Sequence, residues 1–210
     1  MKFEGRRDLI RNVQRSLGIV ADGQDGPVTW RSIYAAVREL RVELGFSGVG
    51  LEMVRLAKEE IGVTEIDGTN CGEMVNEYKA ATWLDSEKGW PWCAAFICWL
   101  VREAIEKESV LFKRPRTAGA WDFENWARSQ VDKGVELYKP PSSGNKPHIR
   151  EGDIVVFRFS HIGLAIGEPT EKGYVKTIGG NTNGAGSREG GSVLEKSRHI
   201  SSIRSVIRIL

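Results

Sequence analysis

Residues 152–181 have the sequence GDIVVFRFSHIGLAIGEPTEKGYVKTIGGN, and this stretch decides the fold class. It contains three short runs rich in Val, Ile and aromatic residues, each bounded by Gly, Pro or charged residues. Such runs predict β-strands joined by turns, in the manner of an antiparallel meander. The last residues, 202–210 with the sequence SIRSVIRIL, predict a further strand.

Helical patterns precede these strands. Residues 51–61 have an apolar face, residues 74–81 form a shorter segment, and the aromatic segment 120–131 also predicts a helix. The apolar run that follows Pro91 predicts a buried helix that begins near Trp92 or Cys93. Because helices come first and strands second, we expect an α+β fold with the helices packed on one face of an antiparallel sheet.

The first part of the chain predicts a separate small unit. Apolar residues repeat at helical spacing on both sides of the turn ADGQDGP at residues 21–27, which indicates two helices. Residues 41–50 are Gly-rich and lose the helical pattern. We therefore predict a helical segment at residues 1–45 and a larger domain at residues 51–210.

Composition excludes several classes of protein. The 210 residues are 40% hydrophobic and 28% charged, as in soluble globular domains, and no apolar run is long enough to span a membrane. The net charge is only +2 with both signs interspersed, which argues against a nucleic-acid binder. The N-terminus lacks the uninterrupted apolar stretch of a secretory signal. We expect a monomer without a signal peptide.

The three cysteines, Cys71, Cys93 and Cys98, are an odd number and include no CxxC pair. A disulfide framework and a zinc site are therefore not expected, and no metal or cofactor is predicted. One cysteine is better placed for chemistry, because Cys93 lies at the predicted start of the buried helix. A helix N-terminus lowers the pKa of a thiol and so favours the nucleophilic thiolate. The alternative is a small buried apolar residue.

A thiolate enzyme needs an imidazole to carry the proton. Of the three histidines, His148 lies in a Pro- and Gly-rich loop and His199 in a polar segment, whereas His161 begins a predicted strand. His161 is therefore the predicted base. A third group should accept the other N–H of the imidazole, and Asn181 at the end of the next strand is the candidate. The alternative for Asn181 is a turn residue.

The order of these motifs resembles a known family. PWCAAF at 91–96, GDIVVF at 152–157, HIGLAIG at 161–167 and GGN at 179–181 are similar to the cysteine- and histidine-dependent amidohydrolase/peptidase (CHAP) family. EIGVTEIDG at 60–68 resembles a segment found in a branch of phage and bacterial wall hydrolases. This resemblance spans most of residues 51–210 and implies a papain-like fold.

The resemblance also implies the chemistry. Cys93 would be the nucleophile, His161 the general base and Asn181 the orienting residue in the cleavage of a peptidoglycan amide bond. Many members of the family have a Glu two residues before this Asn, where this chain has Gly179. Asn181 alone, or a carboxylate such as Glu189 or Glu195, would then fill the third role.

Residues 14–29 resemble a common peptidoglycan-binding helical domain. The matching residues are Gln14, Leu17, Asp22, Gly23, Gly26, Pro27 and Thr29. A wall-binding segment and an ordinary helical hairpin are both compatible with so short a match. Near the nucleophile, Trp92 and Asn70 are the predicted substrate contacts, although aromatic residues are more often core and Asn in a loop more often serves a turn. Trp83, Trp90, Trp121 and Trp126 are further candidates to line a groove.

Several functions remain open at this point. An endopeptidase and an N-acetylmuramoyl-L-alanine amidase would share all these residues. A wall-binding protein without activity, or an acyltransferase that uses the same thiolate, is an alternative from another class. A small wall hydrolase without a signal peptide most resembles a phage endolysin that acts on the wall after release, and an injected antibacterial toxin is the second choice.

Overall fold

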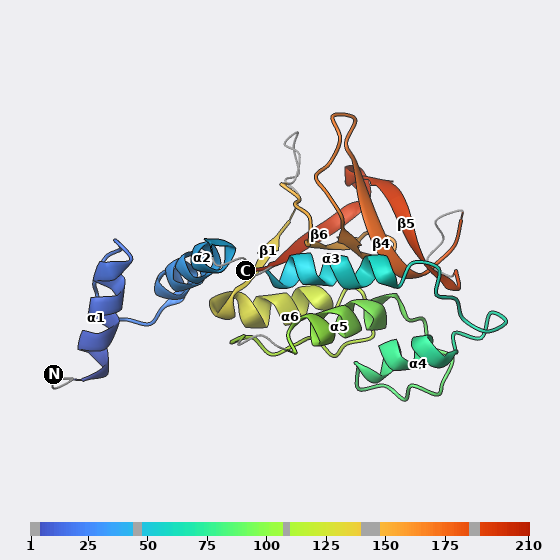
Figure 1. Ribbon diagram of the computed structural model, residues 1–210, viewed down its shortest axis with the longest axis horizontal. Helices are drawn as coiled ribbons and strands as arrows, with labels where there is room; N and C mark the ends of the chain where they lie inside the picture. Colours follow the sequence, from blue (N-terminus) through green and yellow to red (C-terminus); the bar gives the residue numbers. More distant parts are fainter. Residues whose placement is uncertain (1–4, 44–47, 107–109, 140–147, 185–189) are drawn as a thin grey trace.

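The computed structural model describes residues 5–43, 48–106, 110–139, 148–184 and 190–210. Within these residues, six α-helices precede the sheet, and two short 3-10 helices follow α6 and the fifth strand. The helices are α1 (Arg6–Ser16), α2 (Pro27–Glu43), α3 (Val49–Glu59), α4 (Glu73–Ala80), α5 (Cys93–Ala104), α6 (Phe123–Gln130), η1 (Val131–Lys133) and η2 (Ile200–Ser202). Figure 1 shows α1 and α2 to one side of the remaining elements.

All strands belong to one antiparallel six-stranded sheet of order β1-β6-β2-β3-β4-β5. The strands are β1 (Val135–Tyr138), β2 (Ile154–Phe157), β3 (Ile162–Ala165), β4 (Tyr174–Thr182), β5 (Ser192–His199) and β6 (Ile203–Ile209). Strands β2 to β5 form a meander of sequential neighbours, and β6 returns to the open edge of β2. The predicted meander and the predicted terminal strand are therefore confirmed.

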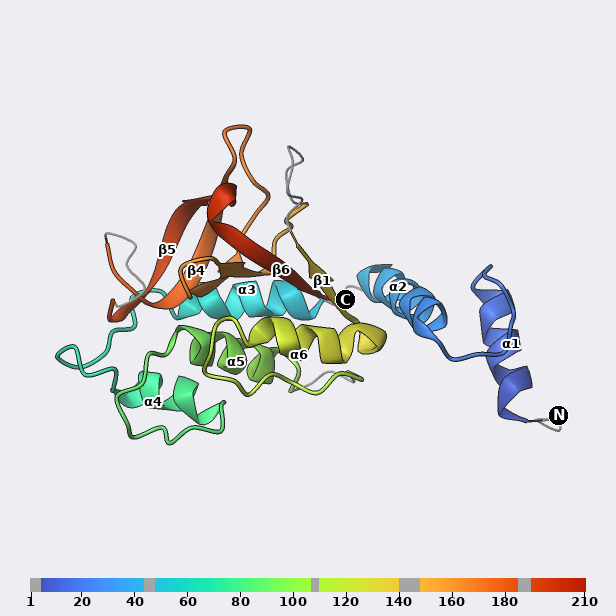
Figure 2. The same ribbon diagram turned by 180° about the vertical axis from the view of Figure 1, so that it is seen from behind.

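The helices α3, α5 and α6 lie on one side of the sheet, as Figures 1 and 2 show from opposite directions. Alternation along β2 divides its side chains between two clusters. Ile154 and Val156 join the large core beneath the helices, whereas Val155 and Phe157 join a smaller cluster on the other face. The predicted α+β class, with helices on one face of an antiparallel sheet, is thus confirmed.

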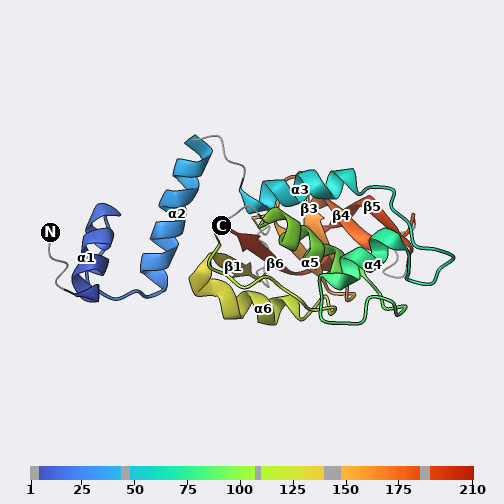
Figure 3. The same ribbon diagram turned by 60° about the horizontal axis from the view of Figure 1, so that its bottom comes forward.

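Helix α5 is the central helix of this core (Figure 3). Ten of its twelve residues are buried, and the two others are Arg102 and Glu103 in its last turn. Residues on all its faces are therefore enclosed by protein. Burying one large apolar side chain stabilises a fold by about 1.5–3 kcal/mol, so this apolar run is a main source of stability. Its first residue, Cys93, is consequently held on a rigid element.

Two strands are absent from the sequence-based prediction. The strand β1 has only four residues, and β5 has the sequence SVLEKSRH with alternating charged residues. Both are edge strands of the sheet, although the start of β5 also forms backbone hydrogen bonds on its outer side, to residues 62–65. An edge strand with an exposed face tolerates polar residues, which removes the apolar signal that identified the inner strands.

The N-terminal segment is stabilised by a buried glutamine. The side-chain amide of Gln14 donates to Asp22 Oδ1 at 2.7 Å and to Thr29 Oγ1 at 2.8 Å, and its oxygen accepts from the N–H of Gly23 at 2.9 Å. Four residues of the wall-binding resemblance therefore form one hydrogen-bonded unit around the turn. Whether this segment, predicted as residues 1–45, binds cell wall stays a prediction. The predicted boundary at 41–50 includes residues 44–47, which lie outside the described residues.

Candidate active site

Cys93 is the first residue of α5, as predicted, and Trp92 is the residue before the helix. The backbone N–H groups of a first helical turn lack partners within the helix, so they point toward a side chain at this position. Cys93 keeps 6% of its surface exposed, whereas Cys98 in the same helix keeps none. Of the two cysteines in α5, only Cys93 therefore keeps any exposed surface.

Cys98 and Cys71 have other surroundings. The thiol of Cys98 donates to the carbonyl oxygen of Thr117 at 3.3 Å, and burial raises its pKa to about 12. Cys71 is partly exposed in the loop before α4, with its sulfur 3.6 Å from the ammonium of Lys79. Because its pKa is raised so far, the Cys98 thiol stays protonated at neutral pH, and Cys98 is therefore a structural residue.

His161 directly precedes β3 and is 1% exposed. Its imidazole stacks on the rings of Phe157 and Phe159, with ring centroids 6.0 and 5.9 Å apart. Among the described residues, Nδ1 of this ring has no hydrogen-bond partner. Burial, with a smaller contribution from the positive charge of Arg198, lowers the pKa of His161 from 6.5 to about 3. The imidazole is therefore neutral at physiological pH and can accept a proton.

This low pKa predicts a loss of stability in mild acid. In the unfolded chain the imidazole takes up a proton near pH 6.5, but in the folded chain it stays neutral until about pH 3. Between these values the unfolded state binds more protons than the folded state. For each unit by which the pH falls, this group should therefore lower the free energy of unfolding by about 1.4 kcal/mol. Denaturant unfolding at about pH 7 and pH 5 measures the effect. The same measurement on His161→Gln should show a smaller pH dependence, and an identical dependence would contradict the prediction.

Asn181 lies near the end of β4, where the pairing with β5 is irregular between Gly179 and Thr182. Its backbone has a left-handed conformation with φ 55°, which Asn adopts more readily than most residues. Its side-chain amide binds three partners, which are the N–H of Trp92, Oδ1 of Asn70 and the carbonyl oxygen of Gly190. No hydrogen bond joins it to His161 in the described part of the chain. The predicted orienting role of Asn181 stays a prediction.

Gly179, rather than Asn181, lies against the imidazole of His161. A Cβ atom at this position would lie 3.2 Å from Nε2 of His161. The position that the sequence resemblance aligns with a Glu therefore faces the histidine, and this chain has no side chain there. Of the alternative carboxylates, Glu195 forms an ion pair with Lys176 at 2.9 Å, and Glu189 lies outside the described residues.

The segment 179–181 also borders the start of α5. The N–H of Trp92 donates to Oδ1 of Asn181 at 3.2 Å, and a Cβ atom on Gly180 would lie 2.5 Å from the ring of Trp92. One side of this segment thus contacts the residue before Cys93, while Gly179 contacts His161. Strand β4 therefore contacts both His161 and the residue before Cys93, which come from distant parts of the sequence.

Trp92 is fully buried, and its indole N–H donates to Oε2 of Glu65 at 3.0 Å. A contact between Trp92 and a substrate would require the indole to leave this position, so the predicted substrate contact stays untested. Glu65 was not assigned a role from the sequence, although it lies within the quoted segment 60–68. Trp83 and Trp90, in the loop that leads to α5, are 71% and 44% exposed and remain available to a ligand.

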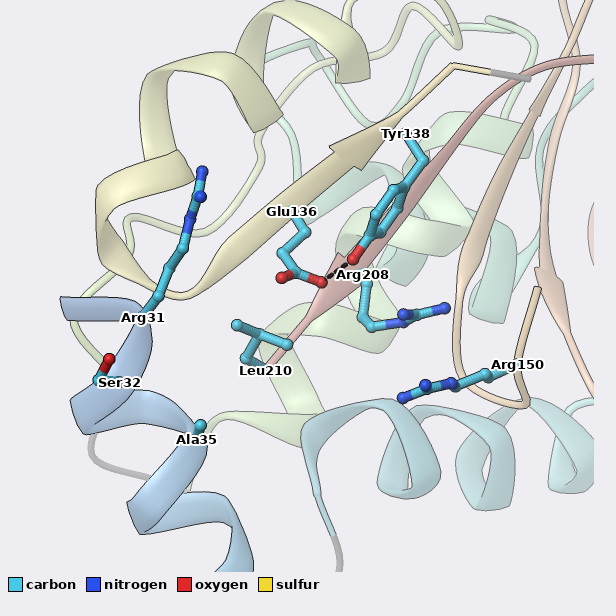
Figure 4. Close-up of a pocket in the computed structure, with 8 residues that line it drawn as sticks. All are labelled: Arg31, Ser32, Ala35, Glu136, Tyr138, Arg150, Arg208 and Leu210. Carbon is cyan, nitrogen blue, oxygen red and sulfur yellow. Dashed lines mark hydrogen bonds between the residues drawn. The ribbon is translucent and has the colours of Figure 1, made fainter. Parts of the chain in front are cut away.

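A hollow of about 450 Å³ lies at the other edge of the sheet (Figure 4). It is lined by Arg31, Ser32, Ala35, Glu136, Tyr138, Arg150, Arg208 and Leu210. The guanidinium of Arg208 pairs with both carboxylate oxygens of Asp153, at 2.8 and 2.7 Å, and stacks on Tyr138. Since β1 and β4 are separated by three strands, this hollow is distinct from the region around Cys93.

The described residues show neither a metal-binding cluster nor a membrane-spanning helix. They contain no group of three or more His, Cys, Asp or Glu side chains arranged to hold a metal ion. None of the helices described is long and apolar enough to cross a membrane.

Comparison with known proteins found similarity among solved structures. No family model and no curated protein sequence matches the chain. Among solved structures, the crystal structure of the wild-type endolysin LysIME-EF1 is similar with 14% sequence identity and a TM-score of 0.45. The similar region covers 76% of this chain and 63% of that protein, so this chain spans less than two thirds of its length. A similarity of this size assigns no function.

Proposed function

We propose that this protein hydrolyses an amide bond of bacterial peptidoglycan, with Cys93 as the nucleophile and His161 as the general base. The observation that carries the proposal is that segment 179–181 contacts both His161 and Trp92, the residue directly before Cys93. A cysteine at the start of a buried helix and a neutral histidine bordered by the same strand segment are the two groups that thiol-dependent amide hydrolysis requires. The CHAP-like order of PWCAAF, HIGLAIG and GGN agrees with this arrangement.

The proposed reaction has two steps. Nδ1 of His161 takes the proton of the Cys93 thiol, and the sulfur attacks the amide carbonyl carbon. Backbone N–H groups at the start of α5 stabilise the oxyanion that forms. The C–N bond then breaks, His161 donates its proton to the departing amine, and a thioester remains on Cys93. Water, deprotonated by the same imidazole, cleaves the thioester to a carboxylic acid and restores the thiol.

The neutral state of His161 suits the first proton transfer. A buried imidazole beside Arg198 resists a positive charge, so His161 is neutral in the resting enzyme. The imidazolium exists only after proton transfer, when the thiolate of Cys93 balances its charge. We therefore expect activity to persist into mild acid until the fold itself is lost.

The biological role that we propose is that of a phage endolysin. In this role, the catalytic domain would cut the wall and the hydrogen-bonded N-terminal segment around Gln14 would hold the enzyme on it. The enzyme would reach the wall after its release from the host cytoplasm.

Mass spectrometry of fragments released from purified peptidoglycan tests the proposed function. The native protein should release soluble fragments, and the same protein alkylated with iodoacetamide should release none. A new free carboxylate on the sugar side chain or within the peptide would identify the cleaved bond. If the native protein sediments with the wall and releases no fragments, the proposed hydrolase function is wrong and the protein is a wall-binding protein.

A further inference from the structure

The start of α5 is held at two points on Trp92. The main-chain N–H of Trp92 donates to Oδ1 of Asn181, and its indole N–H donates to Glu65. The carbonyl oxygen of the same residue accepts the first helical hydrogen bond, from the N–H of Phe96 at 2.9 Å. Any shift of Trp92 therefore moves the first turn of α5 and with it Cys93. The groups that hold Trp92 in place, Asn181 and Glu65, therefore also set the position of Cys93.

The orientation of the Asn181 amide is defined by two main-chain partners. The N–H of Trp92 can only donate, so it faces Oδ1 of Asn181, and the carbonyl of Gly190 can only accept, so it faces Nδ2 at 2.8 Å. The oxygen and nitrogen of this amide are thus assigned without ambiguity. The second proton on Nδ2 then requires another acceptor.

Asn70 supplies that acceptor. Its Oδ1 lies 2.9 Å from Nδ2 of Asn181, and its main-chain oxygen accepts from the ammonium of Lys79 at 2.8 Å. Lys79 is 2% exposed and also binds the carbonyl oxygen of Lys88, so it fixes the loop that carries Asn70. Asn70 has φ 55°, a conformation suited to Asn, Asp or Gly. The result is a chain of contacts from α4 through Asn70 and Asn181 to the residue before Cys93.

We propose that Asn70 and Asn181 are positioning residues, which orient the start of α5 through the N–H of Trp92 and so place the sulfur of Cys93. This inference rests on the proposed function for its catalytic consequence. It differs from the roles that the sequence predicts, because Asn70 acts through Asn181 rather than on the substrate, and Asn181 acts on the nucleophile's helix rather than on His161.

Two nearly isosteric variants separate these roles. Asn70→Asp keeps an oxygen facing Asn181, so fragment release should stay within about threefold of the native rate. Asn181→Asp keeps the acceptor for Trp92 but loses both donors and places an oxygen against the oxygens of Asn70 and Gly190, so the rate should fall about 100-fold. If Asn181 served as the acceptor for His161, the carboxylate of Asn181→Asp would preserve activity.

Asn70→Gly removes the acceptor without backbone strain at φ 55°, and kcat should fall about 10- to 100-fold with little change in KM. Asp67→Gly is the matched control, because Asp67 is exposed in the same loop with φ 50° and should keep the native rate. Thermal unfolding of each variant separates a loss of catalysis from a loss of fold.

The rate of Cys93 alkylation by iodoacetamide provides a readout that needs no substrate. It should decrease and shift in its pH profile in Asn70→Gly and Asn181→Asp but not in Asn70→Asp. These results would support the positioning role even if no wall fragment were released, in which case only the proposed function fails. Native behaviour of Asn70→Gly in both assays, equal damage in Asn70→Asp, or an active Asn181→Asp would each overturn the inference.

Discussion

Replacing Cys93 with alanine should lower the rate of fragment release from peptidoglycan by at least about 1,000-fold, because no other group can form the thioester. The helix start would remain, since alanine fits an apolar helix and removes only the sulfur. Binding to the wall should therefore be unchanged. Fragment release, measured by mass spectrometry, and cosedimentation with the wall are the two measurements.

The other two cysteines provide matched controls for this prediction. Cys98→Ala removes a sulfur five residues further along the same helix, and Cys71→Ser changes a thiol in the loop before α4. Both variants should keep the native rate within a few fold, although Cys98→Ala should cost about 1 kcal/mol of stability through lost packing. An active Cys93→Ala, or an inactive Cys71→Ser that is still folded, would contradict a mechanism based on Cys93.

Replacing Gly180 with alanine should lower the free energy of unfolding by about 1–3 kcal/mol, which is the usual cost of an added methyl group in a closely packed core. The new Cβ would lie 2.5 and 2.8 Å from two ring atoms of Trp92 and 3.0 Å from Cβ of Phe96. Trp92 is fully buried and hydrogen-bonded at both its N–H groups, so it cannot move away freely. Displacement of Trp92 should also reduce activity.

Denaturant unfolding of Gly180→Ala beside Gly167→Ala measures this effect. Gly167 lies just beyond β3, and a Cβ there would have no atom within 4 Å, so its variant should keep the native midpoint. The comparison removes the general effect of exchanging glycine for alanine on the unfolded chain. Equal midpoints for the two variants would show that the contact between β4 and Trp92 is not tightly packed.

Local patterns in the sequence predicted the inner elements of the fold. Apolar runs such as IVVF at 154–157 and the run that follows Trp92 have no stable alternative to burial, so the sequence around them predicts four of the sheet's strands and its central helix. The strand Ser192–His199 escaped prediction because charged residues interrupt its apolar pattern. Its pairing depends on β4, which no local pattern reveals.

The candidate site residues also divide into those that local sequence predicted and those whose contacts depend on distant segments. A cysteine at a helix start and a histidine at a strand start were predictable, because each depends on its own element. The contacts of Asn181 were not, since its partners at positions 70, 92 and 190 come from three other segments of the chain. Glu65 was likewise unassigned until Trp92 was found beside it.

The sequence by itself therefore determined the α+β class, the buried helix and the positions of the candidate thiol at a helix start and the candidate imidazole at a strand start, because these follow from short-range periodicity and residue chemistry. Only the tertiary structure decided what lies against them. Strand β4 places Gly179 against His161, Gly180 against Trp92 and the Asn181 amide against the N–H before Cys93. Such contacts arise from the packing of segments far apart in the chain, and their geometry is set by close packing of the whole core.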